Sequence, residues 1–285
     1  MRALDTFREF TAEVGGRRLA WLEWGSAEAE RTPLVLLHDL RGQSHLWDPV
    51  AGALAERRVI ALDLRGHGDS EHVRPPAYEP RDHLADVEGL LGVLGVRRCA
   101  VMGHGAGGSL GLMLAGAHPE QVERLVLVDV SPDRMGAEVE SVGEVRHAPL
   151  CDFAALREAV REAAPGASES VIDWLLPYLF RAAGEGQEPK WDAAVEARTE
   201  GWKSSLWLAR VRCPALVVRG EESTVLSEQA AMELSEGLDD ARVESVAGAG
   251  HAIMLEQPNG FLEVVLPFLQ ERPPGAAAPP PEAPS

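Results

Sequence analysis

The sequence predicts an α/β protein with one mostly parallel β-sheet and helices on both of its faces. Three observations lead to this prediction. Short apolar runs, typical of strands buried on both faces, alternate along the chain with segments of helical spacing. Polar and glycine-rich motifs directly follow several of these runs. One long block with little strand pattern separates two of the later runs, as an inserted unit would.

The first half of the chain supplies most of the expected strands. Gly15-Gly16 between two alternating segments predicts a hairpin. The expected elements are, in order, strands Arg8–Val14 and Arg18–Trp24, strand Leu34–His38, a short helix Trp47–Ala55, strand Val59–Leu64, a helix Pro80–Leu94, strand Cys99–Met102 and a helix of small residues that ends near Ala117.

In the second half, strands Leu125–Val130, Ala215–Arg219 and Arg242–Val246 and a closing helix Leu255–Gln270 are expected. The block 132–208 lies between the first two of these strands and holds four of the seven tryptophans. We expect it to form a helical cap, with Trp174 and Trp207 facing a pocket at the strand ends. Residues 1–131 and 209–272 would form the core domain, and 273–285 a disordered tail rich in proline and alanine.

Composition narrows the class of protein. The 285 residues include 45% apolar side chains, enough for a large core. The formal net charge of −18 argues against nucleic-acid partners and against anionic membrane surfaces.

Cysteine usage and the N-terminus bear on location. Cys99, Cys151 and Cys213 are odd in number and far apart, which favours a reducing compartment. Charged residues interrupt the first ten positions, and no apolar run is long enough to cross a membrane. We therefore expect a cytoplasmic protein with no membrane span.

Four motifs follow predicted strands and carry a resemblance to a known family. They are Leu37-His38-Asp39-Leu40, the stretch DLRGHGDS at 63–70, Gly103-His104-Gly105-Ala106-Gly107-Gly108, and Gly248-Ala249-Gly250-His251 before the last helix. Their order, together with the inserted block, resembles the α/β-hydrolase fold superfamily over about residues 5–270. Within DLRGHGDS, we expect Arg65, His67 and Asp69 to hold the loop that follows their strand.

The resemblance makes Gly105 the most informative residue. It stands at the centre of the strand–turn–helix elbow, where the family carries Ser, Cys or Asp as its nucleophile. Glycine has no side chain and cannot attack a carbonyl group. Ser109 lies one helical turn further on and should point away from the elbow. If the remaining machinery is intact, Gly105→Ser should create ester hydrolysis.

The same glycines also fit a different ligand class. Gly103, Gly105 and Gly108 match a dinucleotide fingerprint, and Asp129 could be its ribose-binding acid. However, that fingerprint normally lies in the first βα unit, and it leaves the motifs at 63–70 and 248–251 unexplained. We keep it as a remote alternative.

His251 is the expected catalytic base, because the resemblance places that residue after the last strand. A catalytic histidine needs an acid to orient its ring. Ser223 stands where the family's acid is usual, so we favour Asp129, at the position that some family members use, over Glu221 or Glu222.

The resemblance further implies an oxyanion hole formed by the backbone N–H groups of Leu40 and Ala106. Asp39 stands where the family usually has the glycine that follows His38. Four roles remain open for its carboxylate. It could place a negative charge near the pocket, act as a second acid or base, bind a substrate hydroxyl, or face solvent. We also expect His38 and His104 to line the pocket.

Three functions remain open at this point. The first is an enzyme that acts on a small, mostly apolar molecule by non-covalent acid/base catalysis, as a hydrolase using activated water or as a cofactor-free lyase or cyclase. The second is a non-catalytic relative that binds a ligand or partner. The third is a serine hydrolase whose nucleophile has been substituted. No metal and no cofactor are expected.

Overall fold

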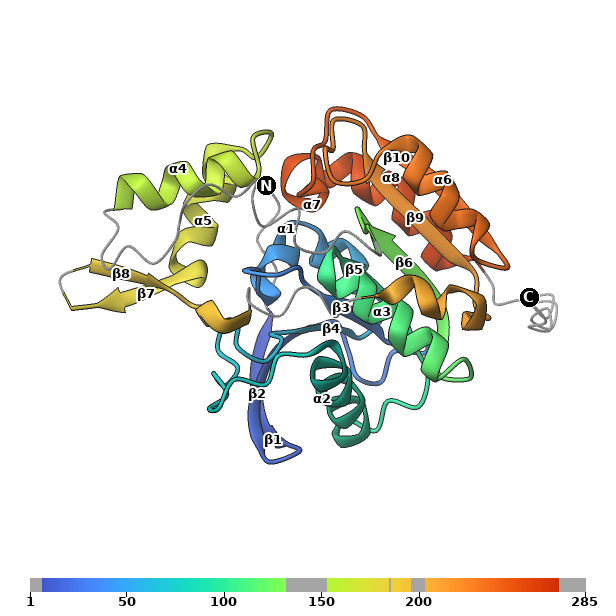
Figure 1. The fold of residues 1–285 in the computed structure, drawn as a ribbon, viewed down its shortest axis with the longest axis horizontal. Coiled ribbons are helices and arrows are strands. Elements are labelled where there is room, and N and C mark those ends of the chain that lie inside the picture. Colours follow the sequence, from blue (N-terminus) through green and yellow to red (C-terminus); the bar gives the residue numbers. More distant parts are fainter. Residues whose placement is uncertain (1–6, 132–152, 185, 196–202, 272–285) are drawn as a thin grey trace, which may run out of the picture.

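The computed structural model describes residues 7–131, 153–184, 186–195 and 203–271 (Figure 1). The expected tail at 273–285 and part of the expected cap, at 132–152 and 196–202, lie outside these residues. The eight strands of the main sheet are ordered β1-β2-β4-β3-β5-β6-β9-β10. Their bounds are β1 (Arg8–Val14), β2 (Arg17–Trp24), β3 (Leu34–Leu37), β4 (Val59–Leu62), β5 (Cys99–His104), β6 (Val122–Val128), β9 (Ala215–Gly220) and β10 (Ala241–Val246).

The sheet is parallel apart from its first edge. β1 pairs with β2 and β2 with β4 in antiparallel register, while the other neighbouring pairs are parallel. The parallel strands therefore end at one common edge, where the loops that follow them meet. The expected mostly parallel sheet is confirmed.

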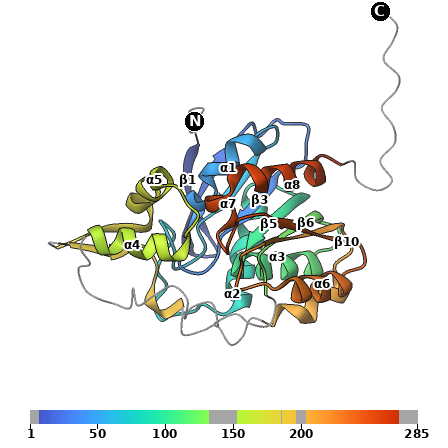
Figure 2. The same ribbon diagram turned by 90° about the horizontal axis from the view of Figure 1, so that it is seen from above.

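Helices cover both faces of the sheet (Figure 2). One face carries α1 (Asp48–Ala51) and α8 (Pro258–Gln270), and the other carries α2 (Pro80–Val93), α3 (Ala106–Ala117) and α6 (Glu228–Glu236). Successive side chains of β3 enter opposite cores, since Leu34 and Leu36 belong to the first and Val35 and Leu37 to the second. Burial on both faces is the reason why this strand is a continuous apolar run.

Two expected helices are interrupted. The helix expected over 47–55 consists of the 3₁₀ turn η1 (Ser44–Trp47), α1 and a second 3₁₀ turn, η2 (Gly52–Leu54). The closing helix is divided into α7 (Ile253–Glu256) and α8 because Gln257, which precedes Pro258, has non-helical angles (φ −135°, ψ 62°). The helix α6 was not expected.

The inserted block is not wholly helical, so that expectation is wrong for the residues described. It contains α4 (Phe153–Ala163), α5 (Glu169–Leu179) and η4 (Ser204–Arg210), and also a hairpin of β7 (Phe180–Ala183) and β8 (Gly186–Pro189). The chain leaves α5 extended at Phe180 (φ −130°, ψ 156°), shortly after Pro177. Gly184 (φ +59°) then allows the turn of the hairpin.

The stretch 63–70 is a structural loop, as expected. The buried Asp63 carboxylate accepts hydrogen bonds from the backbone N–H groups of Ser44 (2.7 Å) and Asp69 (2.9 Å). Arg65 is buried and pairs with both oxygens of Asp86 at 2.6 and 2.7 Å. Gly68 is required here because a Cβ atom would lie 2.2 Å from an Asp63 oxygen. These contacts fix the conformation of the loop.

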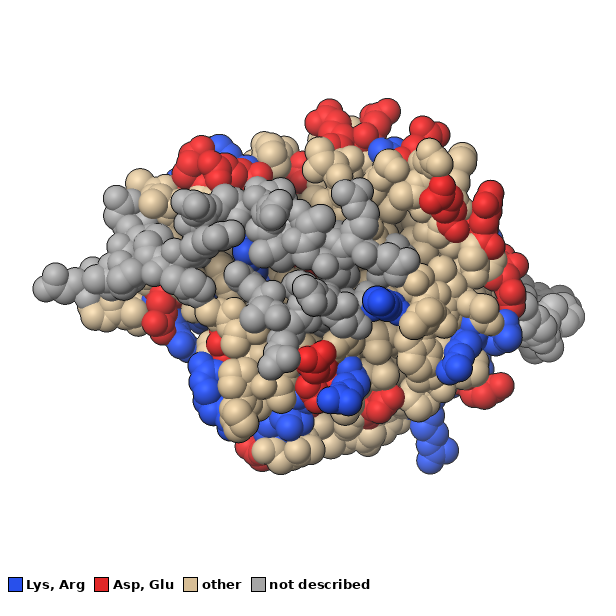
Figure 3. All heavy atoms as spheres, in the orientation of Figure 1, with Lys and Arg blue, Asp and Glu red and all other residues tan. Residues whose placement is uncertain are grey.

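Acidic side chains are unevenly spread over the surface. Figure 3 shows many of them over the part of the molecule that carries α6 and β10, where Glu228, Glu233, Glu236 and Asp239 are exposed. No helix in the described part of the chain has the length and apolar character that a membrane crossing needs.

Three histidines are buried together beneath the site. His38, His67 and His83 are at most 1% exposed, and their rings form edge or tilted contacts. Burial lowers the pKa of His38 to about 4 and that of His67 to about 3, and holds the pKa of His83 well below its usual value. All three are therefore neutral in the folded protein.

We expect this cluster to make the protein sensitive to acid. Below about pH 6.5 the unfolded chain protonates these histidines while the folded chain does not, so the free energy of unfolding falls with pH, by at most ~1.4 kcal/mol per pH unit for each of them. The loss continues until the pH reaches the lowered folded-state pKa values. Urea unfolding over this range measures the slope. His67→Gln should flatten it, and the half-exposed His118, replaced by Gln, serves as the control. An unchanged slope in His67→Gln contradicts the account.

Candidate active site

The centre of the site is a tight turn between β5 and α3. Gly105 has φ +50° and ψ −116°, and α3 begins at the next residue. A Cβ atom on Gly103 would lie 2.2 Å from the carbonyl oxygen of Gly107, so the turn closes only because small residues flank it. The backbone therefore turns sharply between β5 and α3 at a residue that has no side chain.

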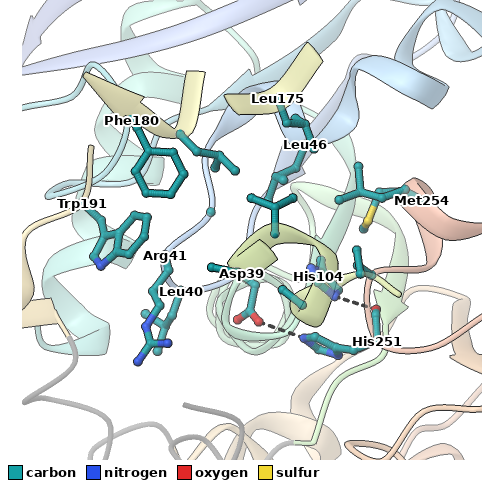
Figure 4. Close-up of a pocket in the computed structure, with 18 residues that line it drawn as sticks. Asp39, Leu40, Arg41, Leu46, His104, Leu175, Phe180, Trp191, His251 and Met254 are labelled. Carbon is teal, nitrogen blue, oxygen red and sulfur yellow. Dashed lines mark hydrogen bonds and ion pairs between the residues drawn. The ribbon is translucent and has the colours of Figure 1, made fainter. Parts of the chain in front are cut away.

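The carboxylate of Asp39, which points toward His251 in Figure 4, occupies the space that a side chain at Gly105 would need. A Cβ atom built on Gly105 would lie 2.2 Å from Asp39 Cγ. Asp39 Oδ1 accepts a hydrogen bond from the backbone N–H of Ala106 at 2.6 Å, and Oδ2 lies 3.0 Å from His251 Nε2. The loop after β3 therefore delivers a functional group to the elbow. A serine at 105 and the present position of Asp39 exclude one another.

His251 lies between two carboxylates. Its Nδ1 is 2.8 Å from Asp129 Oδ2, on the side opposite to Asp39. Asp129 follows β6, is fully buried and has a left-handed backbone (φ +48°), which is strained for a residue other than glycine. Its carboxylate also accepts hydrogen bonds from Ser223 Oγ at 2.5 Å and from the N–H of Gly220 at 3.2 Å. These contacts fix Asp129 and, through it, the histidine ring.

The loop after β9 does not supply the acid that orients His251, although the family's usual acid position lies there. Ser223, at the usual position of the acid, donates to Asp129 instead of contacting His251. The side chains of Glu221 and Glu222 are exposed. Since Asp129 is engaged by His251, the dinucleotide interpretation loses the acid it requires.

Glu256 holds the loop that carries His251, a role that the sequence analysis missed. This buried side chain in α7 accepts hydrogen bonds from the N–H of Gly250 at 3.0 Å and from that of Ala252 at 3.1 Å, on either side of the histidine. It also accepts one from Gly166, between α4 and α5, at 3.3 Å. Glu256 lies five residues beyond His251, and no sequence pattern indicates that its side chain binds the backbone around the histidine.

The charges of the site follow from these contacts. Burial alone would lower the pKa of His251, but the hydrogen bonds to Asp129 and Asp39 outweigh it and raise this pKa well above the usual value. Burial likewise opposes ionisation of Asp39, yet its contacts with His251 and with the Ala106 N–H hold the pKa of this carboxyl well below its usual range. The resting site is therefore an imidazolium between two carboxylates.

His104 differs from His251 although the two rings lie 4.3 Å apart. Its Nε2 donates to the backbone oxygen of His251 at 3.0 Å. Burial, with the charge of His251, lowers the pKa of His104 to about 4. We conclude that His104 is a neutral residue that supports the loop of His251 and lines the pocket.

A cavity of about 130 Å³ opens over Asp39 and His251. It has room for a small acyl group and several water molecules. Apart from Asp39, Arg41, His104 and His251, its described lining is almost entirely apolar (Figure 4). The apolar residues with larger side chains are Leu40, Leu46, Val160, Leu175, Leu179, Phe180, Trp191, Met254 and Leu255.

Three residues expected in the pocket are not among the described residues that line it. The His38 ring is fully buried below it, where Nε2 accepts from the N–H of Leu64 and Nδ1 donates to the Asp39 backbone oxygen. Trp174 donates its indole N–H to Asp48 at 2.8 Å. Trp207 packs beside Gly116 of α3. Helical spacing indicates that such residues are partly buried, but not which surface they pack against.

Asp39, His104 and His251 are also the one group in the described residues with the ligand types for a metal ion, since one ligand atom of each lies within 4.8 Å of the others. The best-placed pair, Asp39 Oδ2 and His251 Nε2, lies at hydrogen-bonding distance (3.0 Å), so each atom already has a partner. The arrangement therefore favours proton transfer over metal binding.

Comparison with known proteins identifies relatives of this chain. A profile described as Alpha/beta hydrolase family matches residues 34–264. The chain is 29% identical over 263 residues to an sn-1-specific diacylglycerol lipase from Mus musculus, covering 85% of this chain and 82% of that one. It is 28% identical over 263 residues to an esterase from Mycobacterium tuberculosis, covering 88% and 86%. Among solved structures, E-2-(acetamidomethylene)succinate hydrolase is similar with a TM-score of 0.84 and 25% identity, covering 93% of this chain and all of that one.

The overlap between Asp39 and position 105 changes what a restored serine should do. We expect Gly105→Ser alone to react poorly with a fluorophosphonate probe, because the new Cβ atom collides with the Asp39 carboxylate, which, even when pushed aside, still competes for the Ala106 N–H and for His251. Adding Asp39→Gly should free the oxyanion donor and raise the labelling rate by about 10² or more. Rates measured by gel fluorescence test this. Equal rates for the single and double variants show that Asp39 does not obstruct the elbow.

Proposed function

Because the chain belongs to the alpha/beta hydrolase family, we propose that it hydrolyses a small, mostly apolar molecule without a covalent intermediate at the elbow. One observation carries the proposal. His251 is held by Asp129 at the floor of a cavity, although Gly105 offers no nucleophile. A site with positioned proton donors and acceptors but no elbow nucleophile suits attack by water.

The lining of the cavity supports a mostly apolar substrate. Leu46, Leu175 and Phe180 are among its walls. A charged group placed against such walls would lose its hydration. The names of the lipase and the esterase given above support esters as the class of bond.

In this proposal His251 transfers protons through Nε2, and Asp129 orients its ring through Nδ1. The Ala106 N–H is bound to Asp39 in the resting site, so the Leu40 backbone N–H is the oxyanion donor to test first. The reaction needs no cofactor. The partner is then a small molecule rather than a nucleic acid or an anionic membrane, and we keep the cytoplasm as the proposed location.

A second candidate is a ligand-binding protein without turnover. The observation that favours it is that Ala106 N–H, Asp39, His251 and Asp129 already satisfy one another. Such a protein would bind apolar ligands and leave them unchanged. Mass spectrometry of an ester incubated with the protein separates the two candidates. Binding of the ester without its cleavage supports the ligand-binding protein, and cleavage supports the hydrolase.

Replacing the proposed proton-transfer groups should abolish turnover. We expect His251→Ala and Asp129→Asn to lower kcat for p-nitrophenyl butyrate by about 10²–10⁴. Glu222→Gln removes an exposed carboxylate near the usual acid position and should leave kcat unchanged. Release of p-nitrophenol gives the rates. Full activity in His251→Ala rules out the proposed mechanism.

A further inference from the structure

Because the elbow has no nucleophile, water is the attacking group in the proposed reaction, and a side chain must accept one of its protons. Asp39 is placed to do so, because its carboxylate lies where the elbow side chain would be and faces the cavity with 16% of its side chain exposed. No other carboxylate among the described residues lines this cavity. Asp129, the other carboxylate of the site, is fully buried behind the histidine ring.

We infer that Asp39 is the general base that removes a proton from the attacking water, while His251 is the general acid that protonates the leaving group. The inference rests on the proposed function and assigns its two proton-transfer roles. This assignment differs from the expectation from the sequence, in which His251 is the base.

The contacts of His251 require this division. With protons on both ring nitrogens, one facing Asp129 and the other Asp39, the ring has no lone pair with which to accept a proton. It can only donate. Asp39, in contrast, keeps further lone pairs on both oxygens after accepting from Ala106 and His251.

The proposed catalytic cycle uses Asp39 and His251, which are already in contact. Water forms a bond from its oxygen to the ester carbonyl carbon, and one of its protons passes to Asp39. As the tetrahedral intermediate collapses, the bond to the leaving oxygen breaks and that oxygen takes the Nε2 proton of His251. The acid and the alcohol leave, and the proton on Asp39 returns to His251 across their 3.0 Å contact.

Attack by Asp39 itself fits the geometry less well. Its Oδ1 lies on the Ala106 N–H at 2.6 Å, so the substrate's carbonyl oxygen has no access to that donor while the carboxylate attacks. The product of such an attack would be a mixed anhydride, which is no easier to form than the hydrolysis product itself. Water can approach Asp39 from the cavity without disturbing this contact.

The dependence of rate on the leaving group separates the two roles. Asp39→Asn keeps the shape of the side chain and removes the base, so kcat should fall by about 10²–10⁴ for both p-nitrophenyl butyrate and phenyl butyrate. His251→Gln should cost more for phenyl butyrate, because phenolate needs protonation more than p-nitrophenolate does. Glu222→Gln is the control for loss of a carboxylate, and thermal unfolding checks that each variant folds.

A single turnover in H₂¹⁸O tests the water step directly. We expect the label in butyrate and none in the peptide that contains Asp39. Label in that peptide overturns the inference by making Asp39 the nucleophile, and unchanged or increased kcat in Asp39→Asn overturns it by making Asp39 an obstruction. If the parent protein hydrolyses the esters, the second outcome leaves the proposed function standing, whereas the first removes its claim that no covalent intermediate forms. If the folded parent protein cleaves neither ester, or His251→Ala cleaves them fully, both fail together.

Discussion

The contact on which the site depends is the one between the Asp39 carboxylate and the elbow. This carboxylate accepts the Ala106 N–H, pairs with His251 and fills the volume beside Gly105. These three contacts depend on one another. A side chain at position 105 would expel the Asp39 carboxylate from the elbow. A neutral residue at position 39 would leave His251 with a single carboxylate. The absence of a side chain at Gly105 and the presence of the Asp39 carboxylate beside it are therefore linked features of the site.

The rest of the fold holds this pair in place. The parallel strands bring the loops after β3, β5, β6 and β10 to one edge of the sheet. Glu256 fixes the backbone on both sides of His251, and Ser223 and Gly220 fix Asp129. Rigid partners of this kind keep donors and acceptors in register for proton transfer, which depends strongly on distance.

The sequence predicts the fold and the local motifs well, since apolar runs and the glycines that follow them act over a few neighbouring residues. It also indicates Gly105, His251 and Asp129 as the residues to examine. It could not show that Asp39 enters the elbow, because that depends on how two loops from separate strands meet. Trp174 and Trp207 were misplaced for a related reason, since helical spacing marks a buried face but not its partner.

The central claim is that His251 is an imidazolium held between Asp39 and Asp129. Proton and nitrogen NMR of the histidine ring at about pH 7.5 tests it most directly, because an unperturbed histidine with a pKa near 6.5 is mostly neutral there. We expect protons on both nitrogens of His251, each shifted downfield by its carboxylate, with the Nε2 proton lost in Asp39→Asn. A neutral ring protonated at Nδ1 alone in the parent protein would contradict it.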